Sequence, residues 1–172
     1  MFEKFGEFDS AEELNRAAAA QMEQGDDEAL IALAEENGID REDAEDYIDG
    51  CADKLATPLM AAVGKIRVEY ESLKLKGILV DWKDVVVDLC TENTDLQEAV
   101  RRKGNCLRDC MAALIRFAFE NKEQVSEEIV KATKVTHNGK EEPLRGPLYL
   151  GIPNKTQTKK IILDYYLGRS CR

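Results

Sequence analysis

The sequence predicts a mainly α-helical protein, folded as a compact multi-helix bundle. Two observations support this prediction. Sequence patterns that begin and end helices recur along the chain, and apolar residues recur at helical spacing. The clearest apolar stripe is Trp82, Val85, Val86, Leu89 and Cys90. The chain has 172 residues, 44% of them apolar and 34% charged, which suits a globular protein with a real core.

The first third, residues 1–53, is predicted to form an acidic segment of three short helices. It holds 18 Asp and Glu residues against three basic residues, a formal charge of −15 in a chain whose total is −10. Ser10 and Glu13 form a capping-box pattern that begins the first helix. Aspartates stand where the next two helices begin: Asp26 or Asp27, then Asp40. Glycines mark the three helix ends: Gly25, Gly38 and Gly50.

Residues 54–172 are predicted to form the helical core. We expect the two segments to make one cooperative domain, because the acidic segment has few apolar residues of its own. A long helix is expected from Thr57-Pro58, a pair that suits the N-cap and first helical positions. Gly64 lies inside this helix, which indicates a close contact with another element because glycine otherwise weakens a helix.

Three further helices are expected before residue 131. Thr94 and Gln97 form a capping-box pattern for a short helix that ends near Gly104. Arg101 falls in its last turn, where the helix dipole favours positive charge. Asn105 is expected to cap the following apolar helix, and residues 125–130 suggest another short one.

Residues 134–153 interrupt the helical pattern and are a candidate functional or mobile loop. The sequence allows a small β-hairpin near 134–143, with a type I′ turn at Asn138-Gly139. The tail, residues 154–172, is predicted to return to a helix with a basic face, capped by Thr156 or Thr158.

Little in the sequence indicates catalysis. It lacks phosphate-binding, dinucleotide-binding and metalloprotease motifs, and it has a single histidine, His137. We therefore expect no enzyme activity, no cofactor and no metal. Cys106 and Cys110 are four residues apart, but a metal site would need two more ligands, so we expect structural thiols. The first ten residues have no apolar stretch, so we expect no signal peptide and a cytoplasmic location.

Two charged surfaces are candidate partner sites. Carboxylates on short helices can occupy places that phosphates would take in a basic groove, although a solvated face would have the same composition. The candidates are Asp26, Asp27, Glu28, Glu35, Glu36, Asp40, Glu42, Asp43, Asp46 and Asp49. The basic tail could instead contact nucleic acid, or it could dock on the core with its charges outward. The candidates there are Lys155, Lys159, Lys160, Tyr166 and Arg169.

Four stretches resemble one protein family in order along the chain. They are MFEKFGEFDSAEELN, ENGIDREDAEDYIDG, KGNCLRDCMAALIRFAFEN and YLGIPNKTQTKKIILDYYLG. The chain thus resembles the type II-A anti-CRISPR proteins that are similar to PcfK-like proteins of conjugative elements.

The resemblance implies a non-catalytic inhibitor of the type II CRISPR RNA-guided DNA nuclease. The protein would be carried by a phage, plasmid or conjugative element and would act in the cytoplasm of a bacterial host. That nuclease holds its heteroduplex in positively charged channels, so a DNA-mimicking acidic surface has the right sign to compete there. The resemblance equally allows an accessory role in plasmid or conjugative transfer, in which the tail contacts DNA or a relaxase complex.

Overall fold

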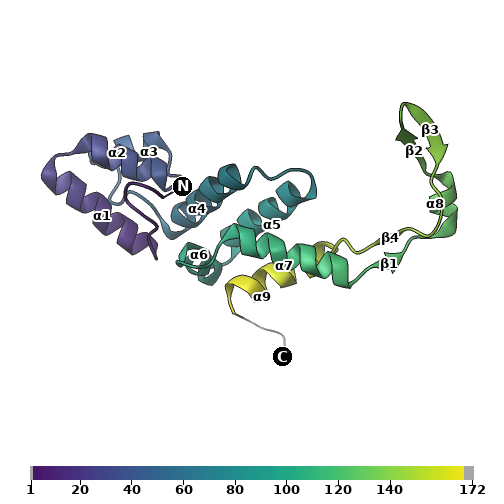
Figure 1. The fold of residues 1–172 in the computed structure, drawn as a ribbon. Coiled ribbons are helices and arrows are strands. Elements are labelled where there is room, and N and C mark those ends of the chain that lie inside the picture. Colours follow the sequence, from purple (N-terminus) through teal and green to yellow (C-terminus); the bar gives the residue numbers. More distant parts are fainter. Residues whose placement is uncertain (1, 169–172) are drawn as a thin grey trace.

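The computed structural model describes residues 2–168 and confirms the mainly helical fold. Within this range there are nine helices and two small antiparallel strand pairs. The chain forms an acidic head, a helical body and a thin arm that projects from the body on the side away from the head (Figure 1). We define the head as residues 2–53, the arm as residues 121–154 and the body as the other described residues.

The head consists of α1 (Ala11–Gln24), α2 (Asp27–Glu36) and α3 (Arg41–Ile48). The predicted ends of the first two helices are confirmed. The Ser10 side chain accepts a hydrogen bond from the Glu13 amide at 3.1 Å, and Gly25 ends α1 with a φ of 68°. Asp26, one of the two expected caps, accepts from the Ala29 amide at 2.9 Å. The head therefore follows from local signals that require no distant partner.

The body consists of α4 (Pro58–Leu73), α5 (Ile78–Glu92), α6 (Thr94–Arg101), α7 (Leu107–Glu120) and α9 (Lys155–Tyr166). Its central element is α4, which contacts α1 of the head as well as α5, α6 and α7. Two apolar clusters meet along this helix. Ala61 belongs to the cluster under the head, and the next residue, Ala62, belongs to the cluster of the body with Trp82 and Leu114.

Gly64 makes the close contact that its place in the helix predicts. A methyl group added at Gly64 would lie 2.5 Å from the backbone oxygen of Asn37. The turn residue Gly38 sits against the same point, and its φ is 73°. The turn between α2 and α3 therefore rests directly on the backbone of α4, an approach that only glycine permits at both positions.

Two predicted helix caps lie one to four positions beyond the observed cap. At α6 the cap is Asn93 rather than Thr94; its side chain accepts from the Leu96 amide at 3.1 Å, while Gln97 donates to the Cys90 carbonyl at 2.7 Å. At α9 the cap is Asn154 rather than Thr156 or Thr158, and it forms a reciprocal capping box with Gln157. Asparagine caps a helix at least as well as threonine, so adjacent candidates compete.

The arm contains β1 (Glu123–Gln124), α8 (Glu127–Ala132), β2 (Lys134–His137), β3 (Lys140–Pro143) and β4 (Tyr149–Leu150). The hairpin predicted near 134–143 is confirmed, with positive φ at both turn residues, 51° at Asn138 and 78° at Gly139. The loop after it returns as β4, which pairs with β1. Figure 1 shows these elements extending away from the body.

We predict that Gly64→Ala destabilises the fold, although Gly→Ala in an exposed helix stabilises by about 1 kcal/mol. The added methyl meets rigid backbone, so the free energy of unfolding should fall by about 1–3 kcal/mol or more. Urea unfolding measures the change. Ala112→Gly, an exposed position in α7, gives the size of the propensity effect alone. An unchanged or increased stability of Gly64→Ala would show that the turn can separate from α4 without cost.

Candidate functional site

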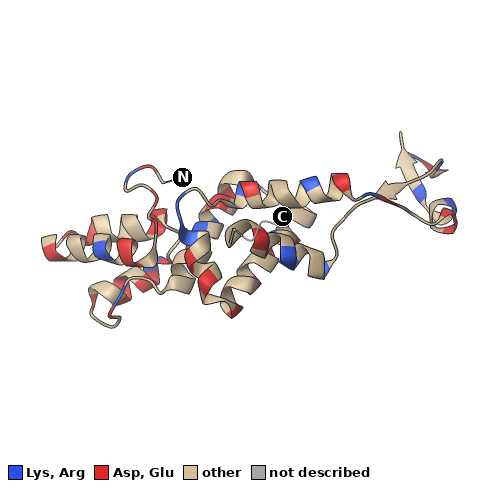
Figure 2. Ribbon diagram, turned by 90° about the horizontal axis from the view of Figure 1, so that it is seen from below, with Lys and Arg blue, Asp and Glu red and all other residues tan. Residues whose placement is uncertain are grey.

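The ten candidate carboxylates lie on α2 and α3 or immediately beside them. Eight are exposed, and Glu36 and Asp43 are half-buried. Figure 2 shows the acidic residues of the head distributed along its helices with few basic residues among them. The structure thus collects the predicted residues on one part of the molecule, but it does not give all of them the same role.

Three of the ten carboxylates are engaged in contacts within the fold. Asp26 caps α2. Glu36 accepts hydrogen bonds from the backbone amides of Lys4 at 2.9 Å and Phe5 at 3.1 Å, which fixes the N-terminal segment against α2. Asp40 occupies the predicted N-cap position of α3, but its side chain makes no capping hydrogen bond.

Asp40 instead pairs with Arg67 of α4. The Arg67 guanidinium donates to Asp40 Oδ1 at 2.6 Å, and this hydrogen bond, with the nearby positive charge, lowers the pKa of Asp40 below its ordinary value. Both side chains are largely exposed, so the pair orients the head on the body more than it stabilises it.

The remaining exposed carboxylates form what we call the acidic surface. Each lies on α2, α3 or the residue that ends α3, and none forms a hydrogen bond or ion pair through its side chain with another described residue. The acidic surface consists of Asp27, Glu28, Glu35, Glu42, Asp46 and Asp49. Such a surface can bind a basic partner, because its carboxylates are free to accept hydrogen bonds and need not break internal pairs first.

Beneath the head lies a seam of buried charged groups that sequence reasoning missed. Lys65 of α4 is 1% exposed. Its ammonium donates to the carbonyls of Arg102 at 2.9 Å and Asn105 at 2.7 Å, and it pairs with Glu7 of the head. Lys65 falls on the apolar stripe of α4, three residues after Ala62. A charged residue on an apolar stripe is the sequence signal from which this buried cation could have been predicted.

Arg101, which the helix dipole alone accounted for in the sequence, is the second buried cation of the seam. It is 1% exposed. Its Nη2 atom donates to Asn37 Oδ1 at 2.5 Å, and Nη1 lies 3.5 Å from the Ala61 carbonyl. Burial lowers the pKa of Arg101 to about 10, opposed by the charges of Glu7 and Glu69. The group remains a cation at neutral pH.

Glu69 completes the seam and takes over a role expected of Asn105. It is 4% exposed, and its Oε2 atom accepts from the Leu107 amide at 2.6 Å at the start of α7. Asn105, the predicted cap of this helix, instead donates to the Ala99 carbonyl at 2.7 Å. Burial raises the pKa of Glu69 above its ordinary value, and the Leu107 hydrogen bond and Lys65 partly offset this effect.

The basic candidates of the tail lie on α9, but fewer are available than expected. Lys155 and Lys160 are exposed, and Lys159 is half-buried 3.9 Å from Glu92. Tyr166 is 3% exposed within the body, so its ring cannot stack on a base while α9 stays docked. Arg169 lies outside the described residues.

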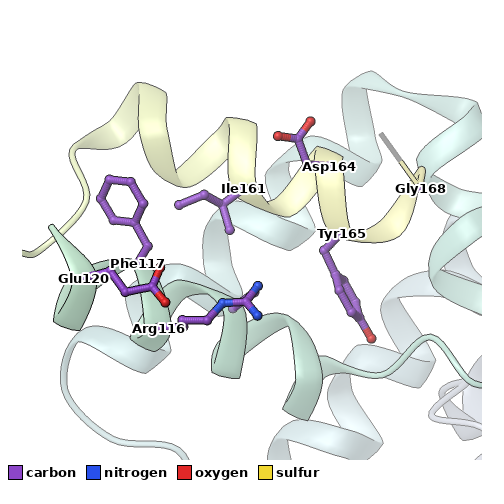
Figure 3. A pocket seen from close by; sticks show the side chains of 8 residues that line it. Arg116, Phe117, Glu120, Ile161, Asp164, Tyr165 and Gly168 are labelled. Atoms are coloured by element: carbon purple, nitrogen blue, oxygen red, sulfur yellow. The ribbon is translucent and has the colours of Figure 1, made fainter. Parts of the chain in front are cut away.

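An open pocket lies between α7 and α9 (Figure 3). Its volume is about 510 Å³. Arg116 and Glu120 extend into it from α7, and Ile161 and Tyr165 from α9. The Tyr165 hydroxyl accepts from the Cys106 amide at 3.0 Å and donates to the Cys106 carbonyl at 3.1 Å, so it is engaged in joining the two helices. We assign no reaction to this pocket.

The described cysteines add no further candidate site. Burial raises the pKa values of Cys90 and Cys110 to about 12, so both stay protonated at neutral pH. Cys51 is exposed, and Cys171 lies outside the described residues. Within residues 2–168 no three metal-ligating side chains come together, and no helix in that range is long and apolar enough to span a membrane.

Comparisons with protein-family models, with curated proteins and with solved structures give no match to this chain.

The raised pKa of Glu69 predicts a pH dependence of stability. Above 4.5, its ordinary value, the folded protein holds a proton that the unfolded chain has lost. The contribution of Glu69 to the free energy of unfolding therefore falls as pH rises from 4.5 through the folded pKa. We predict that the stability of the wild type relative to Glu69→Gln falls as pH rises from 4.5 to 7, measured by urea unfolding.

Glu71→Gln, an exposed position on the same helix, corrects for the change in net charge. If the free energy of unfolding of the wild type instead rises relative to that of Glu69→Gln between pH 4.5 and 7, the seam favours the ionised carboxylate.

Proposed function

We propose that this protein is a non-catalytic inhibitor of a type II CRISPR RNA-guided DNA nuclease and that it binds through its acidic surface. The observation that carries the proposal is the group of six exposed, unpaired carboxylates on α2 and α3. The sequence resemblance supplies the class of partner. A head with a formal charge of −15 has the sign needed to approach a channel built for nucleic acid.

The negative charge of the acidic surface affects how fast, and with which partner, the protein associates. Complementary charge speeds association and selects against wrong partners, more than it adds raw affinity. The six carboxylates are held on short folded helices, so little ordering entropy is lost when they bind.

The buried charged groups support a binding role over a catalytic one. Lys65, Glu69 and Arg101 all lie in the seam that joins head and body. Their partners are backbone groups, Asn37 and Glu7. A group committed in this way is poorly placed to exchange protons with a substrate.

A cleavage assay with the guide-loaded nuclease of the host tests the proposal. We predict that wild-type protein blocks cleavage, and that the triple variant Glu35→Lys, Asp46→Lys and Asp49→Lys inhibits at least about tenfold more weakly. These three positions lie near the C-terminal ends of α2 and α3, where the helix dipole favours cations, so the variant should stay folded. Asp26, Glu36 and Asp40 are left unchanged because their side chains make contacts within the fold.

The matched control reverses three exposed carboxylates of the body: Glu71→Lys, Glu98→Lys and Glu120→Lys. Both triple variants have the same net charge, so a loss confined to the head variant locates the binding surface. Full cleavage at excess wild-type protein would overturn the proposed function. Equal inhibition by the two variants would retain an inhibitor but move its binding surface off the head.

A second candidate function is an accessory role in plasmid or conjugative transfer. The exposed side chains of Lys155 and Lys160 on α9 favour it, because they could contact a phosphate backbone. Gel shifts with duplex and single-stranded DNA separate the two functions. Salt-sensitive binding that Lys155→Gln and Lys160→Gln abolish supports the accessory role. Absence of DNA binding, with a stable complex on the nuclease, supports the inhibitor.

A further inference from the structure

The β2–β3 hairpin has one strand edge that can accept another strand. Its two-residue turn makes His137 and Lys140 a hydrogen-bonded pair, and such pairs alternate along an antiparallel ladder. The hydrogen bond from the Leu144 amide to the Thr133 carbonyl, at 2.9 Å, continues this alternation. The backbone N–H and C=O groups of Lys134 and Thr136 therefore point away from β3.

The opposite edge of the hairpin, along β3, is poorly suited to pairing. Its outward positions are Glu141 and Pro143, which lie across from Thr136 and Lys134. Pro143 has no N–H group to donate, and proline on an edge strand is a common means of preventing strand addition. A copy of β3 added here would also bring carboxylates close together. Only the β2 edge offers an unbroken set of donors and acceptors.

The β2 edge is complementary to itself. In an antiparallel pairing of β2 with β2 of a second copy, every outward group is used when Lys134 lies opposite Thr136 of the other chain. The twofold axis then passes at Val135, which lies opposite its own counterpart. Val135 is 41% exposed. This register places no like charges directly opposite each other and covers an apolar side chain.

Charge and shape favour a second copy at the arm. The arm has five basic and five acidic residues and so no net charge, whereas the head carries −15. Contact through the arms keeps the two acidic heads at opposite ends of the assembly, because head and arm lie on different sides of the body (Figures 1 and 2). The arm is thus the part of the chain where two copies meet with least repulsion.

The arm also lacks a core that would stabilise it in isolation. Of the described valine, leucine, isoleucine and tyrosine side chains of the arm, only Val130 is buried. Five large apolar side chains in or next to the arm are at least half exposed: Phe119, Ile129, Tyr149, Leu150 and Ile152. A two-stranded sheet is only marginally stable in water. A four-stranded sheet that covers apolar groups can be stable by itself.

We propose that a second copy of this chain pairs with the β2 edge, forming a four-stranded antiparallel sheet in the order β3-β2-β2-β3 across a twofold axis at Val135. The dimer follows from the hairpin itself and does not depend on the nuclease. It adds an interaction surface at the end of the molecule that the acidic surface does not use.

Cysteine cross-linking tests the register. Residues opposite each other in a non-hydrogen-bonded pair have Cα atoms about 4.5 Å apart, which is within disulfide range. In a full-length Cys51→Ser, Cys171→Ser background, we predict that Val135→Cys forms a covalent dimer under mild oxidation. Glu142→Cys, directly across the hairpin from Val135, should remain monomeric on a non-reducing gel. Equal cross-linking of the two variants, or none at Val135→Cys, would overturn the proposal.

Sedimentation of the full chain provides a second measurement. Thr136→Pro removes an outward N–H that the hairpin does not use, and we expect it to raise the dimer dissociation constant at least tenfold. Glu141→Pro makes the same change on the opposite edge and should leave that constant within about twofold of wild type. A wild-type chain that stays monomeric up to about 100 µM, or equal weakening by both prolines, would count against the β2 edge.

Discussion

The contact between the Asn37-Gly38 turn and α4, beside the seam of buried charged groups, determines how the rest of the molecule is arranged. Backbone meets backbone at Gly64, and the buried Asn37 side chain donates to the Leu33 carbonyl at 2.9 Å while accepting from Arg101. A single turn is thereby tied to α2, α4 and α6. Without this contact the head would be held mainly by its apolar cluster and by the Glu7–Lys65 and Asp40–Arg67 pairs.

The charges inside the seam balance. Two cations, Lys65 and Arg101, lie near two carboxylates, Glu7 and Glu69. Isolated, each would be costly to bury, but together they satisfy backbone groups at the start of α7 and after α6. Glu7 comes from the head and the other three come from the body. The seam therefore specifies how the two parts fit, and an apolar contact would be less selective.

Local signals in the sequence predicted most of the fold, and long-range pairing explains the remainder. Ser10, Thr57-Pro58 and Asn138-Gly139 act within a few residues of themselves, so their patterns were sufficient. The seam could not be predicted in this way. Lys65 binds carbonyls 37 and 40 positions away, and Arg101 binds Asn37 at a separation of 64.

The candidate site shows the same division between local and long-range information. Composition identified an acidic segment, and the structure places it on a folded surface. Sequence alone could not separate the carboxylates that serve the fold from those free to bind. Glu36 and Glu35 are neighbours, yet Glu36 accepts backbone amides from the N-terminal segment while Glu35 is exposed. The difference depends on a segment 31 residues away along the chain.

The two ends of the molecule suit different kinds of contact, and this constrains any assembly. A dimer through the heads would bring two segments of −15 together, whereas a dimer through the neutral arms holds them far apart. Beyond about 8 Å at physiological ionic strength, exposed charges are largely screened, so an arm-to-arm dimer adds little repulsion. Such a dimer would hold its two acidic surfaces far apart, so each could bind a basic partner without competing with the other.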